Sequence, residues 1–151
     1  MKKFIVLVLG QFISSIGSGL TDFGLAIYVY ILTGSVMATS IISICAFLPS
    51  VVLAPIGGVL ADHYDRRLMM IFGELFSGLS LLICIGTIAS NNPSFIVICI
   101  GVAVNSIFAA LIEPSFKASI SDLLTEEDFA KAGGITQIAA NAKLLVSPLI
   151  A

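Results

Sequence analysis

Residues 57–67, with the sequence GGVLADHYDRR, form a short charged segment between two apolar stretches that are each long enough to cross a lipid bilayer. Four of its last six residues are charged: Asp62, Asp65, Arg66 and Arg67. A short loop with paired arginines is retained on the cytoplasmic side of a membrane, and the two glycines allow neighbouring helices to approach closely. The segment therefore predicts a cytoplasmic connection between two membrane-spanning helices.

The composition predicts an integral membrane protein. Of the 151 residues, 58% are hydrophobic and 11% are charged, and the mean hydropathy is +1.13. Soluble domains carry about 25% charged residues, so this chain is too apolar for an ordinary soluble domain, and nothing in it indicates nucleic-acid binding. The cysteines Cys45, Cys84 and Cys99 lie in apolar stretches without paired spacing or a nearby histidine, which is typical of small buried hydrophobic residues.

The apolar runs predict an all-α membrane fold with four complete helices and the start of a fifth. Each of the first four meets the need for about 20 apolar residues. The predicted helices cover residues 4–32, 36–60, 68–89, 95–112 and 126–151. The first run continues to Leu32 without a small-residue cleavage site, so we interpret it as a retained helix rather than a signal peptide. Because a half-crossed fifth helix leaves backbone groups without partners, we expect the chain to be the incomplete N-terminal part of a larger protein.

The basic residues predict the orientation of the helices. The connections at residues 33–35 and 90–94 carry no charge. The lysines and arginines near the helix ends lie on the opposite side, at Lys2, Lys3, Arg66, Arg67, Lys117 and Lys131. The positive-inside rule then predicts a multi-pass protein of the cell membrane with a cytoplasmic N-terminus.

The charged segment resembles the signature loop between the second and third helices of major facilitator superfamily transporters. Gly58, Asp62, Arg66 and Arg67 match that signature, whereas His63 replaces its first basic residue and Asp65 its glycine. The resemblance implies twelve helices in two six-helix halves, each half built from inverted three-helix repeats. It also implies that the remaining helices are needed as partners for function.

Further segments resemble the macrolide-efflux branch of the superfamily, and siderophore exporters share much of the same pattern. These segments are residues 10–17, 47–49, 114, 123–127, 132–137 and 146–148. The resemblance implies a transporter, not an enzyme, that uses protons to export a drug-like or siderophore-like small molecule by alternating access. No cofactor is expected, because the chain carries no nucleotide loop, metal-ligand set or haem motif. The alternative is a short, non-transporting helical bundle with a regulatory or interaction role in the membrane.

Four polar residues of the first helix are candidates for binding a proton or substrate. Gln11, Ser15, Ser18 and Asp22 recur at spacings of four, three and four, which places them along one helix face. An acid is costly in lipid, so Asp22 is expected to face the bundle interior or water. The alternative is that Asp22 reaches the membrane interface at the outer end of a long helix.

Three further candidates lie on the fourth and fifth helices. Asn105 stands about where many transporters of the family place an arginine, and Glu113 lies on the same broad face. Glu113 is four residues before Lys117, the favourable order for an ion pair if the helix continues past Pro114. Lys143 either partners an acid such as Glu113 or extends to the interface along its methylene groups.

The charged segment itself is a candidate conformational gate. In similar transporters this loop contacts the other half of the protein in one state, which implies a gating role for Gly58, Asp62, Arg66 and Arg67. The alternative is that the two arginines act only as topology anchors. Glu74 is interpreted as structural, with a contact to the arginines of this loop.

Overall fold

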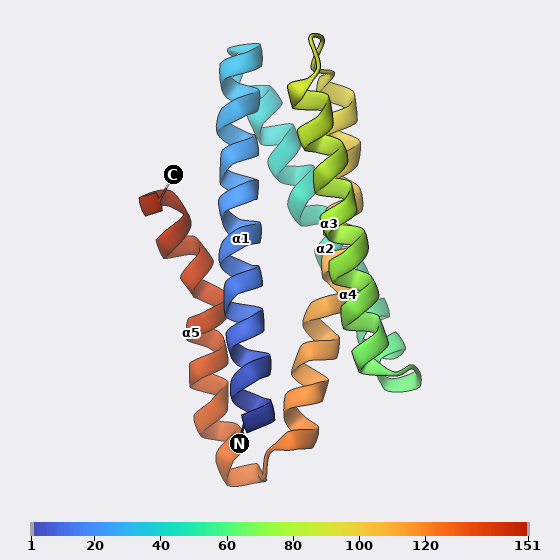
Figure 1. Cartoon of the computed structure of the whole chain (residues 1–151), viewed down its shortest axis with the longest axis vertical. Coiled ribbons are helices and arrows are strands. Elements are labelled where there is room, and N and C mark those ends of the chain that lie inside the picture. The colour runs from blue at the N-terminus through green and yellow to red at the C-terminus, as the bar shows by residue number, and fades with distance from the viewer. Residues whose placement is uncertain (1, 151) are drawn as a thin grey trace.

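The computed structural model describes residues 2–150 and, within that range, every side chain except those of residues 127, 129, 131, 139, 140, 142–144 and 147. Within this range the chain folds into helices only (Figure 1). Their bounds are α1 Lys2–Thr33, α2 Val36–His63, α3 Arg66–Ala89, α4 Phe95–Leu123 and α5 Glu126–Ile150. Of the described helices, four, α1 to α4, are long and apolar enough to cross a membrane. The predicted all-α membrane fold is confirmed.

The fourth helix differs from its predicted bounds. It does not end near Ile112 but continues through Pro114 to Leu123. A proline inside a helix removes one backbone hydrogen bond, yet membrane helices tolerate it where neighbouring groups compensate. The carbonyl left without a helical donor is that of Ala110. Other contacts hold the turn together: the Ser115 hydroxyl donates to the Leu111 carbonyl at 2.7 Å, and the Glu113–Lys117 ion pair connects the turns on either side of the proline.

Short turns join the first three helices. Gly34 adopts a positive φ of 62° between α1 and α2, a conformation that glycine adopts without the strain caused by a Cβ atom. The Ser35 hydroxyl then accepts a hydrogen bond from the backbone N–H of Ala38 at the start of α2. At the start of α3, the Asp65 carboxylate accepts one from the backbone N–H of Arg67 at 3.0 Å. Both residues are helix N-caps, which satisfy backbone donors that the helix leaves unpaired.

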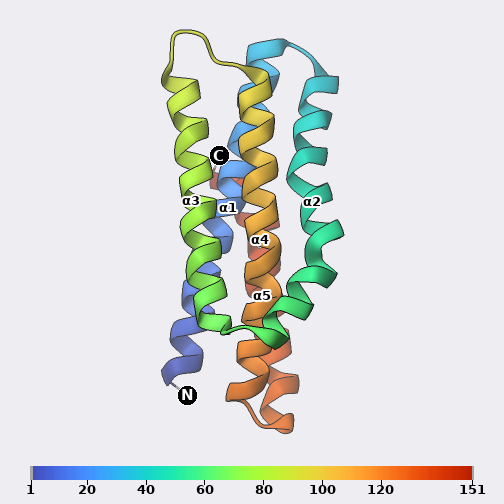
Figure 2. The same ribbon diagram turned by 90° about the vertical axis from the view of Figure 1, so that its right-hand side faces the viewer.

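Helix α4 lies between α2 and α3 and packs extensively against both (Figure 2). Helix α1 packs against α5 and α2 but makes few contacts with α4. A core cluster joins α1, α2 and α4 through the side chains of Leu25, Val29, Ile42, Ile98 and Val102. Because α1 and α4 otherwise touch little, space remains between them in the other half of the bundle.

A serine of α4 is inserted into the backbone of α2 close to Pro49. The Ser106 hydroxyl donates to the Ala46 carbonyl at 2.5 Å and accepts from the Ser50 N–H at 3.2 Å. In an unbroken helix that N–H and that carbonyl would bond to each other. Insertion of a side chain at this point bends a helix, and α2 bends along its length in Figure 2.

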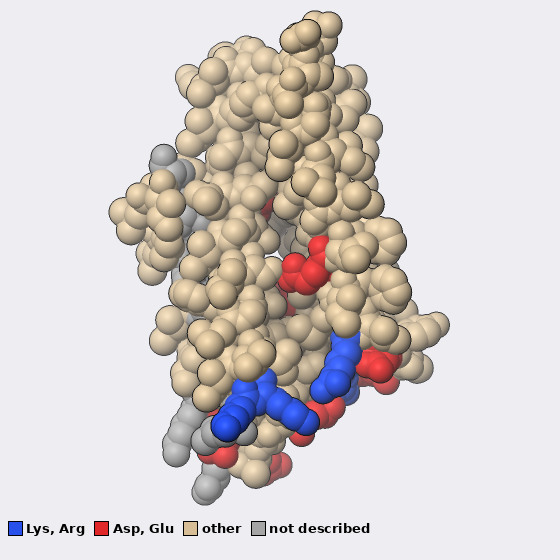
Figure 3. Space-filling model, viewed as in Figure 1, with Lys and Arg blue, Asp and Glu red and all other residues tan. Residues whose placement is uncertain are grey.

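The outer surface is apolar over most of its length. Large hydrophobic side chains stand exposed on several helices, including Ile31 at 75%, Met37 at 75% and Phe47 at 70% exposure. Lysine and arginine side chains gather at one end of the molecule, the lower end in Figure 3. This distribution suits a protein that lies in lipid, with its basic residues at one boundary.

Candidate functional site

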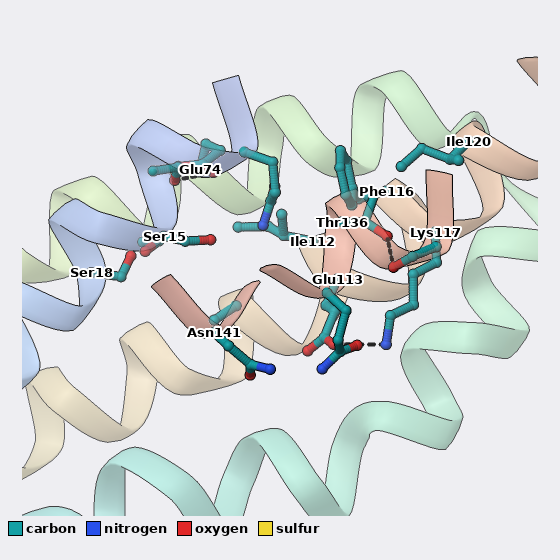
Figure 4. Close-up of a pocket in the computed structure, with 16 residues that line it drawn as sticks. Ser15, Ser18, Glu74, Ile112, Glu113, Phe116, Lys117, Ile120, Thr136 and Asn141 are labelled. Carbon is teal, nitrogen blue, oxygen red and sulfur yellow. Dashed lines mark hydrogen bonds and ion pairs between the residues drawn. The ribbon is translucent and has the colours of Figure 1, made fainter. Parts of the chain in front are cut away.

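A polar cavity of about 390 Å³ lies between α1, α3, α4 and α5 (Figure 4). Its polar lining comes from all four helices: Gln11, Ser14, Ser15, Ser18, Glu74, Ser77, Glu113, Lys117, Thr136, Gln137 and Asn141. Apolar side chains of α4, among them Ile112, Phe116 and Ile120, complete the wall. Polar groups inside a membrane bundle are costly unless they face a cavity or one another. The cavity is therefore the principal candidate site.

The predicted polar stripe of α1 only partly reaches this cavity. Gln11, Ser15 and Ser18 line it, and Glu113 joins them from α4. Asp22 lies one turn beyond Ser18, is half-buried and does not line the cavity. The structure thus brings four of the predicted candidates together and leaves Asp22 farther along α1.

The expected ion pair between Glu113 and Lys117 is confirmed. Lys117 Nζ lies 2.8 Å from Glu113 Oε1, one helical turn apart on α4. The Lys117 side chain is 70% exposed and the Glu113 side chain 65% exposed. The pair therefore stands at an open part of the cavity wall.

Asn105 faces a different neighbour. It is buried and its Oδ1 accepts a hydrogen bond from the Ser77 hydroxyl of α3. Asn105 does not line the cavity, although Ser77 does. The Lys143 side chain lies outside the described residues, so its predicted partner is not defined.

The expected contact between Glu74 and the arginine loop is wrong. Glu74 Oε1 accepts a hydrogen bond from the Ser14 hydroxyl of α1 at 2.7 Å, and both residues line the cavity. Glu74 is eight positions after Arg66, which is about 12 Å along a helix at ~1.5 Å per residue. The sequence alone indicates a structural role for Glu74 and does not single out Ser14, although Ser77 follows Glu74 at helical spacing and indicates a polar face on α3.

Arg66 connects the loop to the far end of α4. Its Nε donates to the Ala61 carbonyl at 3.2 Å, and its Nη1 donates to the Ala118 carbonyl at 2.9 Å. The same Nη1 forms an ion pair with Asp122, a residue that sequence reasoning missed. Arg66 thereby links the end of α2, the start of α3 and the last turns of α4.

The two glycines of the segment have different surroundings. A Cβ atom on Gly57 would lie 2.5 Å from the Ala110 carbonyl oxygen of α4, whereas one on Gly58 would meet nothing within 4 Å. The close approach of α2 and α4 therefore depends on Gly57. Gly58 faces open space in the described part of the chain.

Comparison with known proteins identifies the family of the chain. Residues 7–151 match the family model described as Major Facilitator Superfamily. The chain belongs to this superfamily. Members of the superfamily are transporters rather than enzymes, and the chain is a multi-pass membrane protein.

Three relatives within the superfamily are similar along almost the whole chain. Macrolide efflux protein A of Streptococcus pyogenes is 31% identical over 150 residues, which are 99% of this chain and 37% of the relative. The uncharacterized MFS-type transporter YfiS of Bacillus subtilis is 27% identical over 150 residues, 99% of this chain and 35% of that protein. Enterobactin exporter EntS of Shigella flexneri is 25% identical over 148 residues, 97% of this chain and 36% of that protein.

The chain spans little more than a third of the length of these superfamily relatives. No solved structure matches it. Within the superfamily signature loop, the departure at Asp65 has a structural explanation, because this carboxylate is the N-cap of α3.

Proposed function

We propose that this chain is the N-terminal part of an exporter that moves an amphipathic small molecule out of the cell by alternating access. The observation that carries the proposal is a polar cavity between four helices whose outer surface is apolar. Two of the similar proteins are named for macrolide efflux and enterobactin export, which supports export of a drug-like or siderophore-like solute. Helices beyond this chain are needed, since superfamily transporters bind substrate between two halves.

Within this proposal, Gln11, Ser15, Ser18 and Glu113 contact the solute, and protons drive its export. Asp22 is the candidate proton site nearer the uncharged connections, with Asn105 and Lys143 as further candidates on α4 and α5. Gly58, Asp62, Arg66 and Arg67 form the gate at the opposite end. The support for the gate is Arg66, whose contacts already join three helices.

A thiol-labelling experiment tests the cavity assignment. In the complete transporter, with Cys45, Cys84 and Cys99 replaced by alanine, Ser15→Cys should react with N-ethylmaleimide. Erythromycin or a catecholate siderophore should slow that reaction several-fold, because a bound solute covers the cavity wall. Ser90→Cys, on the connection between α3 and α4, should react at the same rate with and without solute. If neither solute slows labelling at position 15, the cavity is not the transport site, and a non-transporting role gains support.

Orientation in the cell membrane is a separate prediction. We expect Asn92→Cys to react with a membrane-impermeant maleimide added to intact cells, since its connection carries no basic residue. Tyr64→Cys should react only after the cells are opened, because it adjoins Arg66 and Arg67 at the cytoplasmic end. The reverse pattern would contradict a cytoplasmic N-terminus.

A further inference from the structure

We infer that the cavity binds an amphipathic solute with a single positive charge, such as a protonated amine, and that the Glu74 carboxylate receives that charge. The inference rests on the proposed export function, because it names the class of solute for the same cavity. It also assigns a role to a residue of α3 that the signature loop and the α1 stripe do not indicate.

The charge of the cavity wall indicates the charge of the solute that it binds. Among its described lining residues, three are charged: Glu74, Glu113 and Lys117. Lys117 neutralises Glu113 at 2.8 Å, whereas the hydrogen-bond partner of Glu74 is the neutral hydroxyl of Ser14. The described cavity wall therefore carries one uncompensated negative charge, and it lies at Glu74.

A contact with α1 orients the Glu74 carboxylate at the cavity wall. Ser14 donates to Oε1 of Glu74 at 2.7 Å, which orients the carboxylate and leaves the lone pairs of Oε2 for another donor. Figure 4 shows Glu74 beside α1, apart from the Glu113–Lys117 pair. A cation at Glu74 would thus be separated from the ammonium group of Lys117.

Leaving this carboxylate without a counterion costs free energy. Glu74 is about 12 Å into a membrane-spanning helix, at ~1.5 Å per residue from Arg66, where an ionised acid is expensive. The Glu74 side chain is exposed on the cavity wall, so a cation in the cavity can reach it. A bound cation offsets this cost, whereas a polyanionic solute increases it.

The other residues of the cavity wall indicate which uncharged groups the solute carries. Gln11, Thr136, Gln137 and Asn141 supply neutral hydrogen-bonding groups, and Phe116 and Ile112 supply apolar surface. Hydroxyl or carbonyl groups on an apolar framework complement this mixture. The inferred class is therefore a monocationic amphiphile with neutral polar substituents.

Binding of ethidium, a permanent monocation, tests the inference directly. Fluorescence titration of the purified complete transporter in detergent should show saturable binding, and Glu74→Gln should weaken it about tenfold or more, as expected for loss of a charged partner. Ser14→Ala should weaken binding less, since it frees the carboxylate without removing it. Glu126→Gln, at the first residue of α5 and outside the cavity lining, is the matched control and should bind as the wild type does. Equal affinity of wild type and Glu74→Gln, or no binding by the wild type, would overturn the inference.

Dye efflux from cells separates this inference from the proposed function. The wild type should export both ethidium and uncharged Nile red, and Glu74→Gln should slow only ethidium efflux, by about tenfold. An equal loss for both dyes in a variant that remains monodisperse on gel filtration would indicate a positioning role and overturn the assignment of charge recognition. A wild type that binds ethidium through Glu74 but exports neither dye would contradict the export function and leave the cation site standing.

Discussion

Arg66→Ala is expected to impair transport strongly and to destabilise the bundle, whereas Arg67→Ala should do little of either. The Arg66 guanidinium donates to the carbonyls of Ala61 and Ala118 and pairs with Asp122. Hydrogen bonds to a charged group are each worth about 1.5–3 kcal/mol, and the Arg66 side chain is only 27% exposed. Asp122 is 66% exposed, so the ion pair itself adds no more than about 1 kcal/mol. We therefore expect the free energy of unfolding to fall by about 2 kcal/mol or more.

The comparison with Arg67 separates two explanations of the loop. Both arginines contribute equally to the positive-inside signal, so a pure topology anchor predicts equal effects of the two alanine variants. The observed contacts predict unequal effects, because they belong to the Arg66 side chain, while Arg67 contributes its backbone N–H to the Asp65 cap. Thermal unfolding in detergent and solute efflux from cells measure the difference. Matching losses in both variants would restore the anchor explanation.

Lysine at position 66 provides a sharper version of the same test. Lysine keeps the charge but lacks the planar fork of donors that lets arginine reach several acceptors at once. Compared with Arg66→Ala, Arg66→Lys should therefore insert into the membrane as the wild type does and should recover only part of the lost stability. Asp122→Asn should weaken the gate without removing the two carbonyl contacts, so its effect should be smaller than that of Arg66→Ala.

The sequence predicts the membrane fold well because the signals for helices are local. Apolar runs of sufficient length, Gly34 and the charged segment identify four spans and their connections without any knowledge of packing. The bounds of α4 were harder to predict, because whether a helix continues past Pro114 depends on the neighbouring helices that pack around the proline. The Glu113–Lys117 spacing was the one local indication that it does.

The cavity was only partly predictable for a physical reason. Helical spacing shows which residues share a face, and it correctly grouped Gln11, Ser15 and Ser18. It does not show which helix that face meets, so the contact between Ser14 and Glu74 was missed and Asp22 was grouped with a stripe that leaves the cavity. The opposite wall comes from α5, far away in the sequence, and only the folded bundle brings it close.

Gly57→Ala is expected to destabilise the protein more than Gly58→Ala, the other glycine-to-alanine change in the charged segment of residues 57–67. Pro114 has no N–H, so the Ala110 carbonyl lacks its helical donor and lies against the backbone of Gly57 instead. An added Cβ would stand 2.5 Å from that oxygen and 3.3 Å from the Pro114 ring. Neither group can move without separating α2 from α4, which pack extensively. Overpacking of this kind costs about 1–3 kcal/mol, and more where backbone must shift, so we expect low abundance in the membrane and a reduced melting temperature.

Gly58→Ala is the matched control, with the same added methyl one position later. Its Cβ would meet nothing within 4 Å, and alanine is a better helix former than glycine by about 1 kcal/mol. Abundance and melting temperature of this variant should equal or exceed those of the wild type. If both variants destabilise the protein alike, the close contact between Gly57 and Ala110 does not limit the packing of α2 on α4. If Gly58→Ala keeps normal stability but loses transport, the added methyl group blocks a contact with helices that lie outside this chain. That result would support the proposed gating contact with the second half of the transporter.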